Sequence, residues 1–312
     1  KAFLMLIVTM ISARYLGPSN YGLISYAASL IAFVTPIMKL GLVSTLVYEI
    51  VNNPLKEGKI VGTSIVMNFL SGILCLIGVC TFTFFVNAGE TETLIICALY
   101  GISLLFQALE MIQYWFQSKL LSKYSAMSML ISYIIVSILQ VVILLTNKNL
   151  YLFCLTYSLD FLLIAIFLLV IYKNKGTQKL SFSFKIGKKM LNKSKYYIIS
   201  TMMVTIFAQT DKIMLKMMLD NSSVGYYTAG NTCATMFAFV FAAILDSFRP
   251  IVFEAKKKSN EAFQDQMKKL YSILIYFSLL ICLLSTIFSP LILKIMYGKE
   301  YSLAIPVLRV VV

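Results

Sequence analysis

Long apolar runs recur along the whole chain, and they limit its possible folds more than any other feature of the sequence. Several reach about 20 residues, the length at which an α-helix crosses the hydrocarbon core of a bilayer. The 312 residues are 60% hydrophobic and 13% charged, whereas soluble domains carry about 25% charged residues. Because backbone groups in lipid must be satisfied within their own segment, the spans are expected to be helices. The sequence therefore predicts an all-α, polytopic transmembrane helical bundle.

We expect ten spans, of which the first and the last are partial. Their predicted ranges are 1–12, 21–51, 60–87, 93–117, 124–146, 150–173, 195–219, 224–247, 271–297 and 301–312. The chain begins with Lys1 and stops inside an apolar run. We therefore expect the full-length protein to contain further helices.

Basic residues gather on alternate connectors between the predicted spans. One set of connectors holds 18 Lys and Arg residues and the other set holds 3. Because basic connectors stay on the cytoplasmic side, we expect a cytoplasmic N-terminus and outward-facing loops at 13–20, 88–92, 147–149 and 220–223. The long basic connectors 174–194 and 248–270 are either solvated topology signals or amphipathic helices on the inner leaflet.

Turn-forming residues interrupt the apolar pattern in two related segments, "ARYLGPSNYGLISYAASL" (13–30) and "MLDNSSVGYYTAG" (218–230). Four positions match at a constant offset of 203 residues, namely Leu16, Ser19, Gly22 and Ser25 with Leu219, Ser222, Gly225 and Thr228. Parallel repeats are known in transporters. We therefore predict an N-terminal lobe of six spans (1–173), a basic cytoplasmic linker (174–194) and an incomplete C-terminal lobe of about four spans (195–312). The alternative is that any outward helix-turn-helix needs small and turn-forming residues.

Basic residues inside or beside the predicted spans are candidate binding residues, because a charge at a membrane centre costs about 2.5–3.5 kcal/mol and normally faces water or a bundle interior. Gln209, Lys212 and Lys216 share one helical face, which suits a wet cavity that receives an anion. Snorkelling to the interface is the alternative for Lys216. Lys39 follows Pro36, at which a kink is expected. The candidate substrate-binding cations are Arg14, Lys39, Lys212, Lys216, Arg249 and Arg309.

Carboxylates are the candidate coupling groups, because the chain has no histidine. Glu110 and Asp160 are expected to carry a coupling proton, and sodium coupling would use similar oxygens. Asp211 is a third candidate, or else it pairs with a cation on a neighbouring helix. The six cysteines show no metal-ligand spacing, so neither a metal nor a cofactor is expected. We also expect no catalytic residues.

The two turn segments and their extensions, "KLGLVSTLVYEIVNNP" (39–54) and "AQTDKIMLKMMLDNSSVGYYTAG" (208–230), resemble the polysaccharide-biosynthesis or oligosaccharide flippases. These form the Wzx-type branch of the multidrug/oligosaccharidyl-lipid/polysaccharide superfamily. The resemblance implies a MATE-like two-lobe transporter that moves an undecaprenyl-pyrophosphate-linked oligosaccharide across the bacterial cytoplasmic membrane by alternating access. Asp220-Asn221 departs from the glycine that is usual in the family's second turn.

The resemblance also implies which partners the protein has. These are the lipid-linked oligosaccharide, membrane lipids and the polymerase and chain-length machinery of surface polysaccharide assembly, but no nucleic acid. A cation-coupled multidrug exporter and a lipid II flippase remain alternatives, although intramembrane cations disfavour the export of cationic drugs. A membrane glycan polymerase or ligase is a third alternative, which the short outer loops disfavour.

Overall fold

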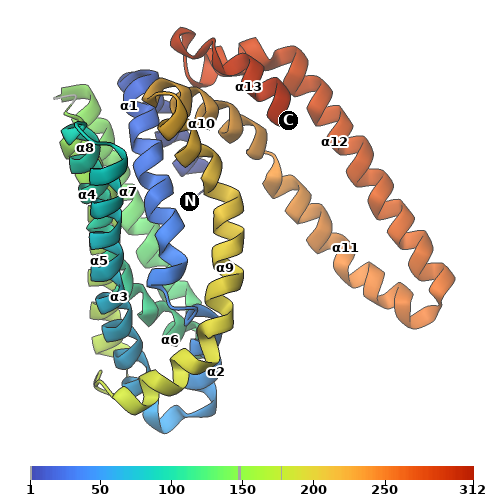
Figure 1. Ribbon diagram of the computed structural model, residues 1–312. Coiled ribbons are helices and arrows are strands. Elements are labelled where there is room, and N and C mark those ends of the chain that lie inside the picture. Colours follow the sequence, from blue (N-terminus) through green and yellow to red (C-terminus); the bar gives the residue numbers. More distant parts are fainter. Residues whose placement is uncertain (1, 147–148, 177) are drawn as a thin grey trace. The chain divides into compact units, whose positions relative to one another are not determined.

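Helices form all the regular secondary structure of the residues that the computed structural model describes, which are 2–146, 149–176 and 178–312 (Figure 1). Parts of three predicted segments lie outside this range: Lys1 of the first span, residues 147–148 of an outer loop and residue 177 of a connector. Eight helical segments of the described chain are long and apolar enough to cross a membrane: Leu4–Met38, Pro54–Val86, Thr91–Ser118, Ser122–Thr146, Leu150–Lys175, Phe184–Met218, Asn221–Lys258 and Asn260–Met296. The predicted polytopic all-α bundle is thus confirmed.

The first two predicted spans are joined in one element, α1 (Ala2–Met38), which is sharply interrupted at Gly17. Gly17 has φ 73° and ψ 171°, a conformation that is open almost only to glycine. Pro18 follows and begins the second helical segment, where its missing N–H costs no hydrogen bond. The turn predicted from "GPSN" is therefore present. Ten spans were expected, but the described chain has eight long segments. The first two expected spans share the single element α1, and the helix in the last expected span is too short to cross a membrane.

The second predicted span is broken between residues 39 and 42. Helix α1 ends at Met38 and α2 (Val43–Asn52) begins after a turn in which Leu40 and Gly41 have φ of 50° and 61°. A side chain on Gly41 would meet the carbonyl oxygen of Ser194 at 2.5 Å. We expected only a kink near Pro36. The chain instead breaks after it, where the backbone lies against a later helix.

The helices that follow form a bundle around two apolar clusters. After a short 3₁₀ turn η1 (Pro54–Lys56) come α3 (Glu57–Val86), α7 (Ser122–Thr146) and α8 (Leu150–Lys175), which are continuous. The predicted span 93–117 is instead divided into α4 (Thr91–Gly101), α5 (Ser103–Gln107), the 3₁₀ turn η2 (Ala108–Met111) and α6 (Ile112–Ser118). A 3₁₀ turn inside a longer helix often marks a hinge or a functional position.

Helix α9 (Phe184–Met218) begins well before the predicted start at 195, so the second half of the 174–194 connector is helical. It packs along α1 and contacts α2 and α3. Residues 178–183 hydrogen-bond to the beginning of α3. Residues 178–194 of the connector therefore pack as part of the first unit.

The remaining helices are α10 (Asn221–Thr235), α11 (Ala238–Lys258), α12 (Asn260–Met296) and α13 (Ala304–Val311), with the 3₁₀ turn η3 (Lys299–Tyr301) before α13. The chain forms two compact units, Lys1–Val224 and Gly225–Val312. In the second unit α12 packs against α11 and α13. The second basic connector (248–270) is a helix–turn–helix centred on Ser259, whose Oγ accepts from the Ala262 N–H and caps α12. The predicted division into an N-terminal lobe that ends at 173 and a C-terminal lobe that begins at 195 stays a prediction. Contacts between helices do not show whether two segments are repeats of one unit.

Candidate functional site

Two predicted candidates, Lys39 and Glu110, meet where two irregular segments face each other. Lys39 lies in the break between α1 and α2, and Glu110 lies in η2. Lys39 Nζ is 3.5 Å from Glu110 Oε2, and the Glu110 side chain is 8% exposed against 23% for Lys39. Removing one of the two charges from a pair this sheltered destabilises the fold, because the remaining charge loses the opposite charge beside it. The structure therefore shows Lys39 bound to a carboxylate of its own chain.

Lys216 forms the second ion pair, with Glu90 at the end of the α3–α4 loop. Lys216 Nζ donates to both Glu90 oxygens, at 2.7 and 3.0 Å, and its side chain is only 4% exposed. The Thr93 hydroxyl donates a further bond to Glu90 Oε2 at 2.6 Å. Burial acts to raise the pKa of Glu90, but the hydrogen bonds from Lys216 and Thr93 outweigh it, so that the pKa is lowered. Lys216 thus fastens α9 to the loop before α4.

Lys212, one turn before Lys216, is differently placed. Its side chain is half-buried, and the described part of the chain offers it no carboxylate within salt-bridge distance. Asp211 Oδ1 accepts from the Lys212 backbone N–H at 2.8 Å. Lys212 is therefore a partly sheltered ammonium group within a membrane segment. The two lysines predicted to share one role have different surroundings.

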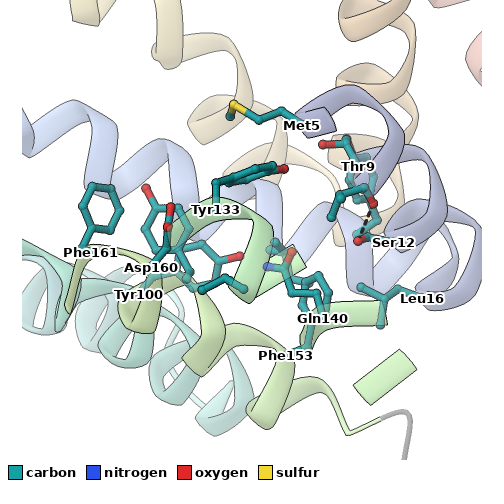
Figure 2. A pocket seen from close by; sticks show the side chains of 15 residues that line it. Met5, Thr9, Ser12, Leu16, Tyr100, Tyr133, Gln140, Phe153, Asp160 and Phe161 are labelled. Carbon is teal, nitrogen blue, oxygen red and sulfur yellow. Dashed lines mark hydrogen bonds between the residues drawn. The ribbon is translucent and has the colours of Figure 1, made fainter. Parts of the chain in front are cut away.

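Asp160 lines a pocket of about 300 Å³ among α1, α4, α7 and α8. Both helical segments of α1 contribute to its wall, from Met5 to Leu16 and from Tyr21 to Ile24. Figure 2 shows Asp160 beside Tyr100 and Tyr133, with Gln140 and Ser12 farther along. The Ser132 hydroxyl lies 2.9 Å from both Oδ1 and the carbonyl oxygen of Asp160.

Aromatic rings form much of the wall of this Asp160 pocket. Tyr100 and Tyr157 stack with their ring centroids 4.4 Å apart, and Tyr157 also contacts Phe161 edge-on at 5.3 Å. Gln140 is held in place because its Nε2 donates to Thr156 Oγ1 at 2.9 Å. A carboxylate with neighbouring hydroxyl and amide oxygens is a suitable acceptor for a proton or a hard cation. Aromatic faces also attract cations.

The three arginine candidates have different surroundings. Arg14 is exposed on the first segment of α1, three residues before Gly17. Arg249 pairs with Asp246 at 3.4 Å on α11, where both side chains are about two-thirds exposed, at 68% and 69%. Arg309 on α13 donates from Nε to Ser289 Oγ on α12 at 3.0 Å.

Sequence reasoning named Lys39, Glu110 and Lys216 as candidates but did not predict how they pair, and it missed Glu90, Glu49 and the lysines that pair with Glu49. Glu90 and Lys216 are 126 residues apart, and Lys39 and Glu110 are 71 apart. Glu49 was not a candidate, yet it is 4% exposed and pairs with Lys193 and, at 3.9 Å, with Lys189. The sole available signal was that Glu49 interrupts an otherwise apolar helical run. No group of three or more potential metal-ligating side chains is found within the described residues.

The chain is similar to one protein family in sequence and to a solved transporter structure in fold. A family model described as "Polysaccharide biosynthesis protein" matches residues 1–256. No curated protein matches the chain. A solved structure, described as the inward-facing conformation of a multidrug resistance MATE family transporter of the MOP superfamily, aligns with a TM-score of 0.64. The alignment covers 99% of this chain and 75% of that chain at 12% identity, so the likeness is one of fold.

Proposed function

The chain belongs to the polysaccharide biosynthesis protein family, and from this premise we propose that it is a flippase for a lipid-linked oligosaccharide. The substrate is an undecaprenyl-pyrophosphate-linked repeat unit, which moves from the inner to the outer leaflet of the bacterial cytoplasmic membrane for surface polysaccharide assembly. The match to the family over residues 1–256 carries this proposal. The multi-pass helical fold, which resembles that of a MATE transporter, supports a transporter role.

Sheltered ionisable residues in the membrane segments further support transport. Such residues are expensive in a bilayer and typically mark substrate or ion paths. Lys39, Lys212 and Glu110 lie in or between the apolar helices of the first unit. In the proposed function, the lysine ammonium groups bind the pyrophosphate while the prenyl chain remains in lipid. Alternating access of the two predicted lobes then carries the headgroup across.

The Lys39–Glu110 pair provides a way to couple substrate binding to a proton. An ionised Glu110 holds Lys39 at 3.5 Å. When Glu110 takes up a proton its charge disappears, the attraction to the ammonium group is lost and Lys39 becomes available to an anion. Asp160, in its pocket of hydroxyl and aromatic groups, is the second proposed coupling site and accepts either a proton or sodium.

Deletion and complementation of the gene test the proposed function. A clean deletion in a strain without a paralogue should abolish surface polysaccharide and leave the lipid-linked oligosaccharide on the cytoplasmic leaflet. Expression of the wild-type chain should restore the polymer. Normal surface polysaccharide in the deletion strain would exclude the flippase function.

A multidrug exporter is a second candidate because the Asp160 pocket combines a carboxylate with aromatic rings. Such a pocket suits an organic cation better than a pyrophosphate. Increased drug sensitivity of the deletion strain, with unchanged surface polysaccharide, would favour the exporter. Accumulation of lipid II, or elongation of glycan chains by the purified protein, would instead indicate a lipid II flippase or a polymerase.

A further inference from the structure

A basic pocket lies at the end of the first unit where α2 ends and where α3 and α9 begin. These helix ends lie near the lower edge of Figure 1. It has a volume of about 340 Å³. Its floor includes the apolar side chains of Ile60, Ile186 and Met190. Four lysines lie along its wall: Lys56, Lys59, Lys185 and Lys189. No residue of this pocket is among the substrate or coupling candidates above.

The positive charge of this basic pocket is largely uncompensated. Its one lining carboxylate, Glu49, is buried and is already neutralised by Lys193 and Lys189. Lys56, Lys59 and Lys185 have no salt bridge to any carboxylate in the described residues. Three exposed ammonium groups therefore surround a concave surface. Such an arrangement favours a ligand with one or two negative charges.

A hydrogen-bonded strap, formed by residues 178–183, fixes the wall of the basic pocket. Gln178 donates from Nε2 to the Pro54 carbonyl at 3.0 Å and accepts from the Gly58 N–H at 3.2 Å. The Ser183 N–H donates to Thr63 Oγ1 at 3.0 Å. These bonds hold the start of α9 against the start of α3. The lysines therefore stand on a preformed site, which reduces the ordering cost of binding.

The exposed apolar side chains beside the lysines favour a lipid over a soluble anion as the ligand of this pocket. Leu55 is 89% exposed and Phe184 is 75% exposed. Each is next to a pocket lysine in the sequence, Lys56 and Lys185 respectively. Apolar and basic side chains interleaved at the ends of membrane helices are typical of the headgroup region, where the apolar groups contact acyl chains and the lysines contact phosphates.

We propose that this basic pocket binds the phosphate headgroup of an anionic phospholipid of the membrane in which the protein lies. The headgroup phosphate contacts Lys56, Lys59 and Lys185, and the acyl chains pass beside Leu55 and Phe184. The site holds a structural or regulatory lipid and is distinct from the proposed path of the transported glycolipid. It does not depend on the flippase function being correct.

Lipid titration of the full chain tests the site. Native mass spectrometry in detergent measures binding of dioleoyl phosphatidylglycerol, with dioleoyl phosphatidylcholine as the uncharged-headgroup probe. The wild type should bind phosphatidylglycerol more tightly. The variant K56Q/K59Q/K185Q should weaken that affinity about tenfold or more, and K185Q alone about threefold. The matched control, K256Q/K257Q/K258Q on α11, removes the same charge and should bind as the wild type does.

Several results would overturn the proposed lipid site. These are equal binding of the two lipids, an unchanged affinity in K56Q/K59Q/K185Q, or an equal loss in the α11 control. Undecaprenyl pyrophosphate provides a second probe. If K56Q/K59Q/K185Q loses this probe but keeps phosphatidylglycerol, the pocket is a substrate site and the proposal is wrong. Matching size-exclusion profiles establish that the variants are folded. Because no transport is measured, a failure here is separate from a failure of the flippase function.

Discussion

Among the lysines of the first unit, Lys39 binds Glu110, Lys216 binds Glu90 and Lys193 binds Glu49, and each of these carboxylates lies far away in the sequence. Two of these lysines belong to α9 near opposite ends of that helix, so the ion pairs hold α9 to the first unit at both ends. Lys212 lies between them without such a partner in the described chain. At the residue scale, the structure therefore distinguishes Lys193 and Lys216, which have carboxylate partners, from Lys212 on the same helix, which has none in the described chain.

The Lys39–Glu110 pair is expected to show strong coupling between its two partners. Lys39→Met leaves a buried carboxylate without its cation and should destabilise the chain by about 1–3 kcal/mol. Glu110→Leu should have a smaller effect because Lys39 is more exposed. The double variant should be more stable than Lys39→Met alone. Thermal unfolding in detergent measures this cycle, and strictly additive losses would contradict the pairing.

The Glu90–Lys216 pair should give stability that depends on pH. Because the pKa of Glu90 is lowered in the folded chain, its contribution is fully present above the pKa of an unfolded glutamate and is lost as the pH falls through the lowered value. The difference in unfolding midpoint between wild type and Glu90→Gln should therefore be constant near neutral pH and shrink in acid below the ordinary glutamate range. A difference that grows on acidification would show that the sign is wrong.

At the scale of elements, the sequence predicted the turns that local chemistry makes. The turn at Gly17 and the turn at Leu219–Asp220 were both predicted, since glycine, proline and Asp-Asn pairs act through their own backbone and side chains. Asp220 Oδ1 indeed accepts from the Ser223 N–H at 2.8 Å at the start of α10. The break at residues 39–42 was not predicted beyond a kink. The positive φ at Leu40 occurs where the break contacts α9. A contact between segments so far apart leaves no signal in the local sequence.

The turn between α1 and α2 should be sensitive to a single methyl group. Gly41→Ala places a Cβ 2.5 Å from the Ser194 carbonyl oxygen at a φ of 61°. We expect a loss of about 1–3 kcal/mol. Gly78→Ala on α3 is the matched control, because its Cβ would meet no atom within 4 Å and alanine favours a helix by about 0.5–1 kcal/mol. Equal unfolding midpoints for the two variants would refute this account of the turn.

At the scale of the whole molecule, hydropathy was sufficient for the fold class because lipid leaves helices as the simplest way to satisfy the backbone. The order of the long apolar segments largely followed the predicted ranges. The candidate sites were less predictable, since Glu90 and Glu49 acquire their roles from contacts across more than a hundred residues. The orientation in the membrane and the two-lobe repeat remain predictions from charge and from the segment match.

Cysteine labelling tests the predicted orientation. In a chain whose native cysteines are replaced, Lys257→Cys should react with a membrane-impermeant maleimide only after the cells are opened, because the basic connectors are expected inside. Glu92→Cys, in the first turn of α4 and within the predicted outer loop 88–92, should react in intact cells. The opposite pattern would reverse the predicted orientation.

The flippase account is tested most directly by glycolipid movement in proteoliposomes. Vesicles that contain the purified full chain and a labelled undecaprenyl-pyrophosphate-linked oligosaccharide report the fraction of label that becomes accessible from the opposite side. The account predicts movement well above that of protein-free vesicles. Lys212→Met should lose most of it, while the exposed control Lys269→Met on α12 should keep it. Movement no faster than in protein-free vesicles, or full activity of Lys212→Met, would contradict the proposed role of the intramembrane cation.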